Sequence, residues 1–420
     1  MSKVQKQNFL EGALIMAIAN IFVKVIGAFF KIPLKNLIGS EGIGMFYGAY
    51  NIYSALVVIS TAGLPVAVSR MVAEASAQGR ERQIDRIFRV SFGLFLTIGA
   101  VSTAVMVFFA RPLLEYQRNP NAYWSLIALA PAVFFVALMS VYRGYCQGLH
   151  NMVPTAVSQL IEAMSKLIFG YGFAILALKL GYGVEVASAG AILGVTLGTI
   201  LGSIYMAVRY RRVREVTRLS DFDANVSSNG EVLKKLVTIA VPITIGAAVM
   251  SLTNLIDNFV VLRRLQAIGY AQEAALSMYG VYSSMAVALM TMPQTLIVGI
   301  TVSLIPAIAE AYGRRDYRKA LASTESAMRL TGMLAFPCAA GLYTLAWPLL
   351  NLLFNSDVDA AALLLEPLAF AFVFVSLVSL TTALMQAAGR ERLPVISMAV
   401  GGVVKIVTNY TLIGIPSVNI

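Results

Sequence analysis

The sequence predicts an all-α, polytopic membrane protein, and three observations carry that prediction: composition, apolar runs of span length, and basic loops. Of the 420 residues, 58% are hydrophobic and 13% are charged, and the mean hydropathy is +0.77. A soluble domain carries about 25% charged residues. Because so few polar side chains are available to cover a surface in water, the composition excludes a water-soluble protein.

Eleven runs reach the length of about 20 mostly apolar residues that a membrane-spanning helix needs. Glu11 leaves too short an apolar run before Ala17-Ile18-Ala19 for a cleaved signal peptide, so the first run is interpreted as a retained span. In chain order the predicted spans are 10–31, 45–67, 88–110, 123–142, 155–178, 187–208, 237–262, 278–304, 326–349, 363–387 and 394–414.

The loops between these runs predict the orientation. With the N-terminus in the cytoplasm, the inside loops are 70–89, 143–153, 209–235, 312–329 and 388–393. Together with Lys3 and Lys6 they hold 22 of the 32 lysines and arginines, and the outside ends and loops hold 7. Excess Lys and Arg mark cytoplasmic loops, so this split predicts a cytoplasmic N-terminus. The net charge of +11 is explained by the same loops, without nucleic acid as a partner.

An internal repeat divides the chain. Val72-Ala73-Glu74-Ala75 recurs as Ile308-Ala309-Glu310-Ala311 at an offset of 236 residues, which also pairs Gly63 with Gly299. Gln147, Gly148 and Pro154 pair with Gln386, Gly389 and Pro394 at offsets of 239 to 241. We therefore expect a six-helix lobe over 1–208, a linker over 209–235 and a second, incomplete lobe over 236–420. Six spans per lobe make this a parallel repeat, a transporter signature. The missing twelfth span suggests a truncated chain.

Charged residues inside predicted spans are the candidate site residues, because each is costly to insert in a bilayer. Lys24 lies roughly 21 Å along the first span, and Lys31 is about 10 Å further. Both could face a central cavity and bind an anionic group. Alternatively, the side chain of Lys31 extends to the membrane–water interface. Arg263, Arg264 and Lys405 are also assigned to substrate binding.

Acidic residues in the spans are candidates for coupling or gating. Glu162 and Lys166 form an i, i+4 pair, either a pair that only lowers the insertion cost or one that opens when substrate arrives. Asp257 lies between Asn254 and Asn258 and suits a proton, Na⁺ or a cavity lysine.

Several classes of site are not expected. One histidine and two lone cysteines, Cys146 and Cys338, argue against a metal centre or a disulfide framework. Asp221-Phe222-Asp223 looks like a glycosyltransferase metal motif, but its short loop has no nucleotide-binding domain around it. No catalytic residue, metal ligand or cofactor is assigned. Gly190, Gly194, Gly198 and Gly202 predict close helix packing, and Pro131, Pro242, Pro293 and Pro337 lie inside spans.

Three stretches of sequence are more specific evidence of a protein family than the number and order of the spans. They are the first span from Lys24 to Pro33, the segment Gly63-Leu-Pro-Val-Ala-Val-Ser-Arg-Met-Val-Ala-Glu74, and Arg143-Gly-Tyr-Cys-Gln-Gly148 with Met152-Val-Pro-Thr-Ala-Val-Ser-Gln159. Together they resemble polysaccharide-biosynthesis flippases of the stage V sporulation protein B type. These are relatives of the lipid II flippase, in the superfamily of the multidrug and toxic-compound extrusion (MATE) transporters.

The resemblance implies a MATE-like fold of two six-helix lobes and a saccharide linked to isoprenyl-pyrophosphate as substrate, moved from the inner to the outer leaflet for cell-wall, cortex or surface polysaccharide. Lys24 and Lys31 match the cationic cavity positions of the first span. Lipid II flippases also carry arginines in the second and eighth spans, which here are apolar except for Asn51 and Gln294. That departure leaves the saccharide open.

Two other functions are weighed. A drug or cation antiporter of the same fold would want acidic residues in its cavity, whereas here cations outnumber acids inside the spans. A sugar-phosphate transferase or polymerase would need acidic clusters or large loops, so no enzyme is expected. We expect a monomer in the bacterial cytoplasmic membrane, in contact with membrane lipids and coupled to Na⁺ or H⁺.

Overall fold

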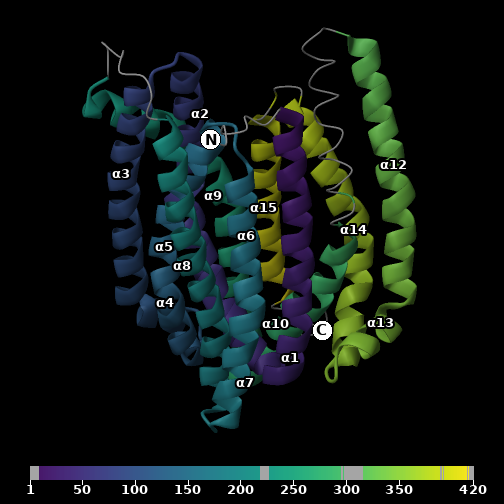
Figure 1. Ribbon diagram of the computed structural model, residues 1–420. Helices are drawn as coiled ribbons and strands as arrows, with labels where there is room; N and C mark the ends of the chain where they lie inside the picture. The colour runs from purple at the N-terminus through teal and green to yellow at the C-terminus, as the bar shows by residue number, and fades with distance from the viewer. Residues whose placement is uncertain are drawn as a thin grey trace. The chain divides into compact units, whose positions relative to one another are not determined.

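The computed structural model describes residues 9–217, 227–294, 316–387 and 392–413, with single positions 297, 390 and 415. Every element within these ranges is a helix (Figure 1). Nine of the described helices are long and apolar enough to cross a membrane, or ten if the bent pair α12 (Tyr317–Thr344) and α13 (Ala346–Leu353) is counted as one span. The prediction of an all-α polytopic membrane protein is confirmed.

Helix α1 (Phe9–Thr61) runs through the first two predicted spans. Gly39 interrupts it with φ 71° and ψ −179°, so α1 is two helices that meet at a sharp break. Glycine reaches a positive φ without the steric cost that a Cβ imposes. The break falls between the predicted spans 10–31 and 45–67, with helix in place of the loop expected there.

The other helices follow the remaining apolar runs and extend beyond most of them. In order they are α2 (Leu64–Ala77), α3 (Glu81–Phe108), α4 (Ala110–Tyr116), η1 (Pro120–Ala122), α5 (Tyr123–Gly148), α6 (Val153–Ser165), η2 (Lys166–Gly170), α7 (Tyr171–Lys179), α8 (Gly183–Thr217), α9 (Asn229–Ala267), α10 (Gln272–Val281), η3 (Tyr282–Ala286), α14 (Val358–Ala387) and α15 (Arg392–Leu412). The predicted span 326–349 breaks at Leu345, where α12 and α13 meet at 73°.

The described chain forms two compact units. Unit 1 comprises 1–23 and 48–258, and unit 2 comprises 24–47 and 259–420. The middle of α1, from Lys24 to Tyr47, thus groups with the C-terminal part of the chain. Its apolar side chains explain this, because Ile32 packs against one core cluster of unit 2 and Tyr47 against another. The predicted lobe boundary at 209–235 stays a prediction.

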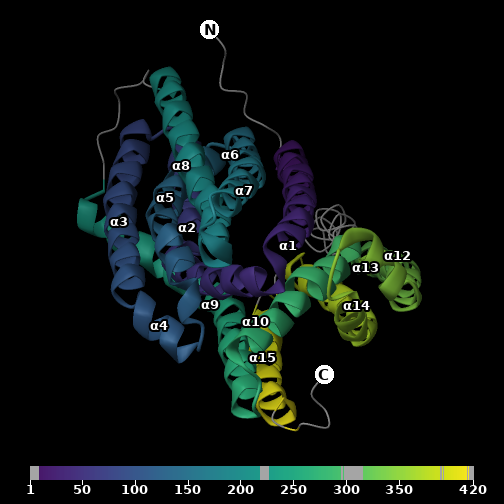
Figure 2. The ribbon, with the colours of Figure 1, turned by 90° about the horizontal axis from the view of Figure 1, so that it is seen from below.

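In unit 1, α5 is the central helix and contacts α2, α3 and α8 (Figures 1 and 2). Its buried residues point in several directions, as an apolar helix surrounded by others requires. Helix α8 packs against α6 and α7 along the predicted glycine repeat. A Cβ on Gly198 would lie 2.9 Å from the Glu162 carbonyl oxygen, and one on Gly190 would lie 3.0 Å from Phe173. Close packing at this repeat is confirmed.

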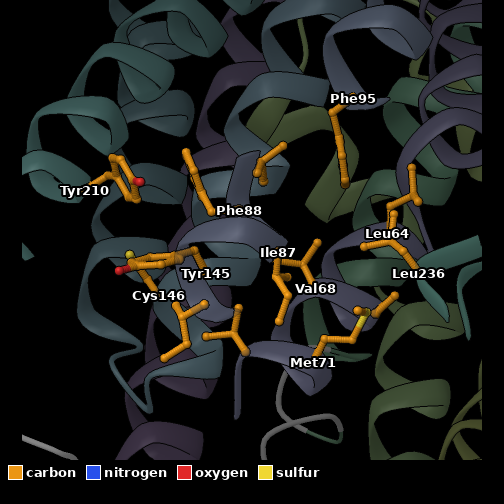
Figure 3. Close-up of a cluster of buried hydrophobic side chains, with 14 of the residues drawn as sticks. Leu64, Val68, Met71, Ile87, Phe88, Phe95, Tyr145, Cys146, Tyr210 and Leu236 are labelled. Atoms are coloured by element: carbon orange, nitrogen blue, oxygen red, sulfur yellow. The ribbon is translucent and has the colours of Figure 1, made fainter. Parts of the chain in front are cut away.

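Aromatic side chains form part of the unit 1 core (Figure 3). The rings of Phe88 and Tyr210 stack with centroids 4.0 Å apart, and Tyr145 meets Phe88 edge to face at 5.4 Å. These pairs join α3, α5 and α8, and each adds about 0.5–1.5 kcal/mol beyond the area it buries.

In unit 2, α12 packs against α14, and α13 packs against both (Figure 2). The apolar cluster that these helices form includes Phe354, Leu365 and Phe372, all buried. A second apolar cluster joins the end of α9 to α10 through Leu262, Leu265 and Leu276, all buried. The middle of α1 packs on α10 so closely that a Cβ on Gly44 would overlap the Leu276 backbone.

Candidate functional site

The five cations predicted to bind substrate, Lys24, Lys31, Arg263, Arg264 and Lys405, all belong to unit 2. Lys24 and Arg263 are exposed on their helices, and the other three are half-buried. Arg263 and Lys405 both make interactions with neighbouring groups. Unit 2 therefore presents positive charge on α1, α9 and α15.

Two of these cations lie over tyrosine rings. The Lys31 Nζ is 5.4 Å from the centroid of Tyr47, and the Arg264 guanidinium carbon is 4.4 Å from the centroid of Tyr410. A cation over an aromatic face gains about 0.5–2 kcal/mol, more where water is excluded. The rings hold the two charged groups on the helices without neutralising them.

The two cation–ring pairs share one apolar cluster. Tyr47 packs against the apolar cluster that includes Leu262 and Leu265, the buried leucines before and after Arg264 on α9. Ile413, three residues after Tyr410, packs against the same cluster. We call Lys31, Tyr47, Arg264 and Tyr410 the cationic cluster. It brings together residues from 31 to 410 that are far apart in the sequence, and it retains two positive charges.

The acidic candidate Glu162 lies in unit 1 on α6, where the Arg143 guanidinium pairs with its carboxylate. Arg143 also donates to the Ser158 hydroxyl, at 2.9 Å from Nε and 2.8 Å from a terminal nitrogen. The sequence placed Arg143 in an inside loop, but it lies within α5, in the segment antiparallel to α6. The hairpin turn between the two helices was the signal that could have joined them.

Lys166, one turn after Glu162, begins the π-helical segment η2. Its Nζ lies 5.0 Å from the centroid of the Tyr50 ring, and Tyr50 meets Tyr53 at 5.6 Å. A π-helical turn widens the helix locally and is frequent at functional sites. The i, i+4 pairing of Glu162 with Lys166 stays a prediction, because the ion pair identified for Glu162 is with Arg143.

Asp257 is buried in unit 1, with 8% of its surface exposed, and interacts with neighbouring groups. The adjacent Asn258 is fully buried and accepts a hydrogen bond from Gln117. Asn119 is also fully buried. The unit 1 part of α9 thus reaches the 117–119 turn through Asn258, which contacts a buried polar side chain of that turn.

A fully buried lysine was missed by the sequence. Lys35, which the sequence placed in an outside loop, has no exposed surface and forms an ion pair with Asp357 at 2.8 Å. Among the residues that the structure describes, no three His, Cys, Asp or Glu side chains gather as metal ligands. The Asp221–Asp223 motif and the repeat partners Gly299, Ile308–Ala311 and Gly389 lie outside the described residues.

Comparison with protein families gives two matches. The family described as polysaccharide biosynthesis protein matches residues 9–312, and the MatE family matches residues 242–411. The first match covers more than half of the chain.

Two curated relatives span nearly the whole chain. Stage V sporulation protein B of Bacillus subtilis is 27% identical over 416 residues, which is 99% of this chain and 80% of that protein. Lipid II flippase MurJ of the same organism is 24% identical over 424 residues, which is 96% of this chain and 77% of that protein.

Solved structures identify the fold. An inward-facing multidrug resistance MATE family transporter of the MOP superfamily superposes with a TM-score of 0.74 at 16% identity, covering 94% of this chain and 90% of that one. A MOP superfamily transporter from Pyrococcus furiosus, described as having a binding pocket of reverse polarity, gives 0.68 at 16% identity over 99% and 91%. The resemblance and the MATE-like fold are confirmed: the chain is a multi-pass membrane protein with the fold of MATE family transporters, and it belongs to the polysaccharide biosynthesis protein family.

Proposed function

We propose that this protein is a flippase that moves an isoprenyl-pyrophosphate-linked saccharide from the inner to the outer leaflet of the bacterial cytoplasmic membrane. The observation that carries the proposal is the cationic cluster of unit 2, in which Lys31 and Arg264 lie over tyrosine rings. A pyrophosphate needs positively charged donors, and a lysine and an arginine are side chains of that kind. The name of one relative, lipid II flippase MurJ, supports the same substrate class.

The proposed transport is alternating access, with a cytoplasmic N-terminus and a monomer as the working unit. Cations bind the pyrophosphate on the inside, the isoprenyl tail stays in the bilayer, and the head group is released outside. The substrate crosses unchanged, so no bond is made or broken. A membrane potential that is negative inside favours outward movement of an anion by about 2.3 kcal/mol per charge per 100 mV.

Resetting the empty transporter is the step for which we propose an ion, Na⁺ or H⁺, with Asp257 or Glu162 as its carrier. Glu162 is paired with Arg143, so protonation of its carboxylate would release that pair. The coupling proposal is rejected if Asp257→Asn and Glu162→Gln variants transport at normal rates under every ion gradient.

The test of the substrate is native mass spectrometry of the whole protein purified with its lipids. We expect the wild type to retain an isoprenyl-pyrophosphate species and Lys24→Ala/Lys31→Ala to lose it. The matched control is Lys234→Ala/Lys235→Ala, which removes two lysines exposed on α9 of unit 1.

Each outcome decides between functions. Retention by the wild type and the control, with loss in the double variant, supports the flippase and its cation site. If the wild type retains no such lipid but binds organic cations, a drug antiporter of the same fold is the better account.

A further inference from the structure

A short helix follows a break at two places in the chain. Ala110-Arg-Pro-Leu-Leu114 and Ala346-Trp-Pro-Leu-Leu350 are 236 residues apart, the offset of the internal repeat. The first begins α4 directly after α3, and the second begins α13 directly after α12. In both helices the alanine and the last leucine are buried. We call residues 110–119 the first elbow and residues 346–357 the second elbow.

The second elbow holds the middle of α1, within unit 2. The Asn36 side chain donates to the Leu353 carbonyl oxygen at 2.9 Å and accepts from the Asn355 amide at 3.1 Å. On the other side of the Gly39 break, the Ser40 hydroxyl donates to the Asp357 carboxylate. The elbow therefore contacts α1 before and after its break.

Lys35 supplies the charged contact of this joint. Its Nζ donates to the Ser356 carbonyl oxygen at 3.1 Å, the Ser356 hydroxyl at 2.7 Å and Asp357 Oδ2 at 2.8 Å. Three donors meet three acceptors, so the ammonium is fully satisfied although it has no exposed surface. Asp357 is held at φ 61°, in the left-handed region that aspartate and asparagine tolerate better than most residues.

The first elbow shows that such a joint needs no charge. In unit 1, Gln117 of that elbow donates to Asn258 of α9, and both side chains are fully buried amides. An elbow can therefore hold a neighbouring helix with neutral groups alone. The ionic contact of the second elbow calls for a reason beyond folding, since a buried ion pair is weak support for stability.

That reason lies in the spacing of the lysines on α1. Lys24, Lys31 and Lys35 are separated by seven and four residues, so they share one face of the helix. The ion pair at Lys35 fixes the rotation of α1 about its axis, and this rotation sets the direction of Lys31, one turn away. The same rotation sets Lys24, within the helical stretch before Gly39.

We propose that Asp357 is a positioning residue for lipid-linked pyrophosphate binding: through its contact with Lys35 it aims Lys31 and Lys24 at the anionic head group. This inference rests on the proposed function and adds a residue that touches no substrate. Asp357 and Lys35 act as one joint, and of the three lysines on this face of α1 only Lys24 and Lys31 meet the substrate.

The experiment compares Asp357→Asn with Asp359→Asn in the whole protein. Asn keeps the size of the side chain and its tolerance of positive φ, but removes the charge that holds Lys35. Asp359 is the matched control, a carboxylate two residues away that accepts from Trp347 Nε1 at 2.8 Å. Binding is measured by titrating the purified proteins with undecaprenyl pyrophosphate and counting the bound species by native mass spectrometry.

A second readout reports the direction of α1. Lys31→Cys is made in a Cys338→Ala background, since Cys146 is buried, and its rate of reaction with a charged thiol reagent is measured with and without Asp357→Asn. We expect Asp357→Asn to weaken lipid binding by about tenfold, to change the labelling rate at position 31 and to lower the melting temperature without preventing folding. Asp359→Asn should change neither binding nor labelling.

The inference is overturned if Asp357→Asn binds and labels like Asp359→Asn while Lys24→Ala/Lys31→Ala loses the lipid. Failure of the wild type to bind the lipid would instead overturn the proposed function. If Asp357→Asn does not fold, Lys35→Gln/Asp357→Asn replaces it, because two amides rebuild the neutral contact of the first elbow. That variant should fold but bind the lipid as weakly as is expected of Asp357→Asn, and wild-type binding would contradict positioning through the ionic contact.

Discussion

At the scale of single residues, Asp357 shows how a partly exposed acid keeps its charge beside a buried base. Burial alone raises the pKa of the Asp357 carboxyl, but hydrogen bonds from Lys35, Ser40 and Ser356, with the charge of Lys35, outweigh it and lower the pKa below the usual value. Its side chain is 36% exposed, so protons reach it from solvent. The charge of the joint therefore depends on pH.

The sign of this dependence follows from the lowered pKa. A carboxyl that titrates lower in the folded protein stabilises the fold above its unfolded pKa, about 3.9, and loses this contribution as the pH falls through the folded value. We expect the melting temperature of the wild type to exceed that of Asp357→Asn at pH 7 and pH 5, and the difference to shrink below about pH 4. Melting curves in detergent from pH 7 to pH 3 measure it. A difference that vanishes between pH 7 and pH 5 would contradict the assignment.

At the scale of helices, the glycine repeat of α8 gives the sharpest prediction. A Cβ on Gly194 would overlap the backbone of Gly170 in η2, whereas a Cβ on Gly172 in α7 would have nothing within 4 Å. Because backbone cannot move aside as a flexible side chain does, Gly194→Ala should destabilise the protein by about 1–3 kcal/mol. Gly172→Ala should be neutral or stabilise by up to about 1 kcal/mol.

Reversible unfolding in mixed micelles compares these two variants. Equal stabilities would mean that α8 and η2 are further apart than the structure places them. The comparison is matched, because each variant adds one methyl group to a helical glycine.

Much of the helical architecture could be predicted, because hydropathy reports the cost of leaving a segment in water and does not depend on distant contacts. The close packing of α8 could also be predicted, because its glycines recur every four residues and so lie on one face of the helix. The break at Leu345 and the burial of Lys35 could not be predicted the same way. Lys35 has its partner 322 residues away, and a lysine after an apolar run usually reaches the interface.

One signal for the elbows was present in the sequence. The Ala-x-Pro-Leu-Leu pair at offset 236 identifies equivalent points in the two halves. Lys31 and Arg264 were predicted as cations of one site, but their tyrosine partners were not. A tyrosine in an apolar run has no feature that tells a cation partner from a core neighbour. Their role in binding substrate stays a prediction.

At the scale of the whole molecule, the two units share the first helix. Residues 24–47 belong to unit 2 although the chain before and after them belongs to unit 1. A cut between α8 and α9 therefore separates unit 2 from part of its own core, including Ile32 and Tyr47.

We expect a chain divided at 217/227 to fold only when both pieces are present. Fragments 1–217 and 227–420, expressed separately, should be degraded or aggregate, and their co-expression should restore a stable complex that co-purifies. The control is co-expression with Asp357→Asn in the second fragment, which should reduce the yield because it weakens a contact across the cut. Recovery of the second fragment alone, folded and with a cooperative melting transition, would contradict the shared helix.

The long reach of the Lys35–Asp357 contact also bears on how the protein is made. Its two residues leave the ribosome 322 residues apart, and at about 5–20 residues per second the lysine waits roughly 15–60 s for its aspartate. During that time α1 carries the charged Lys35 before Ser356 and Asp357, its hydrogen-bond partners in the folded protein, have been synthesised. Water at the bilayer surface or an insertase must hold it, so completion of the joint is a late event in membrane insertion.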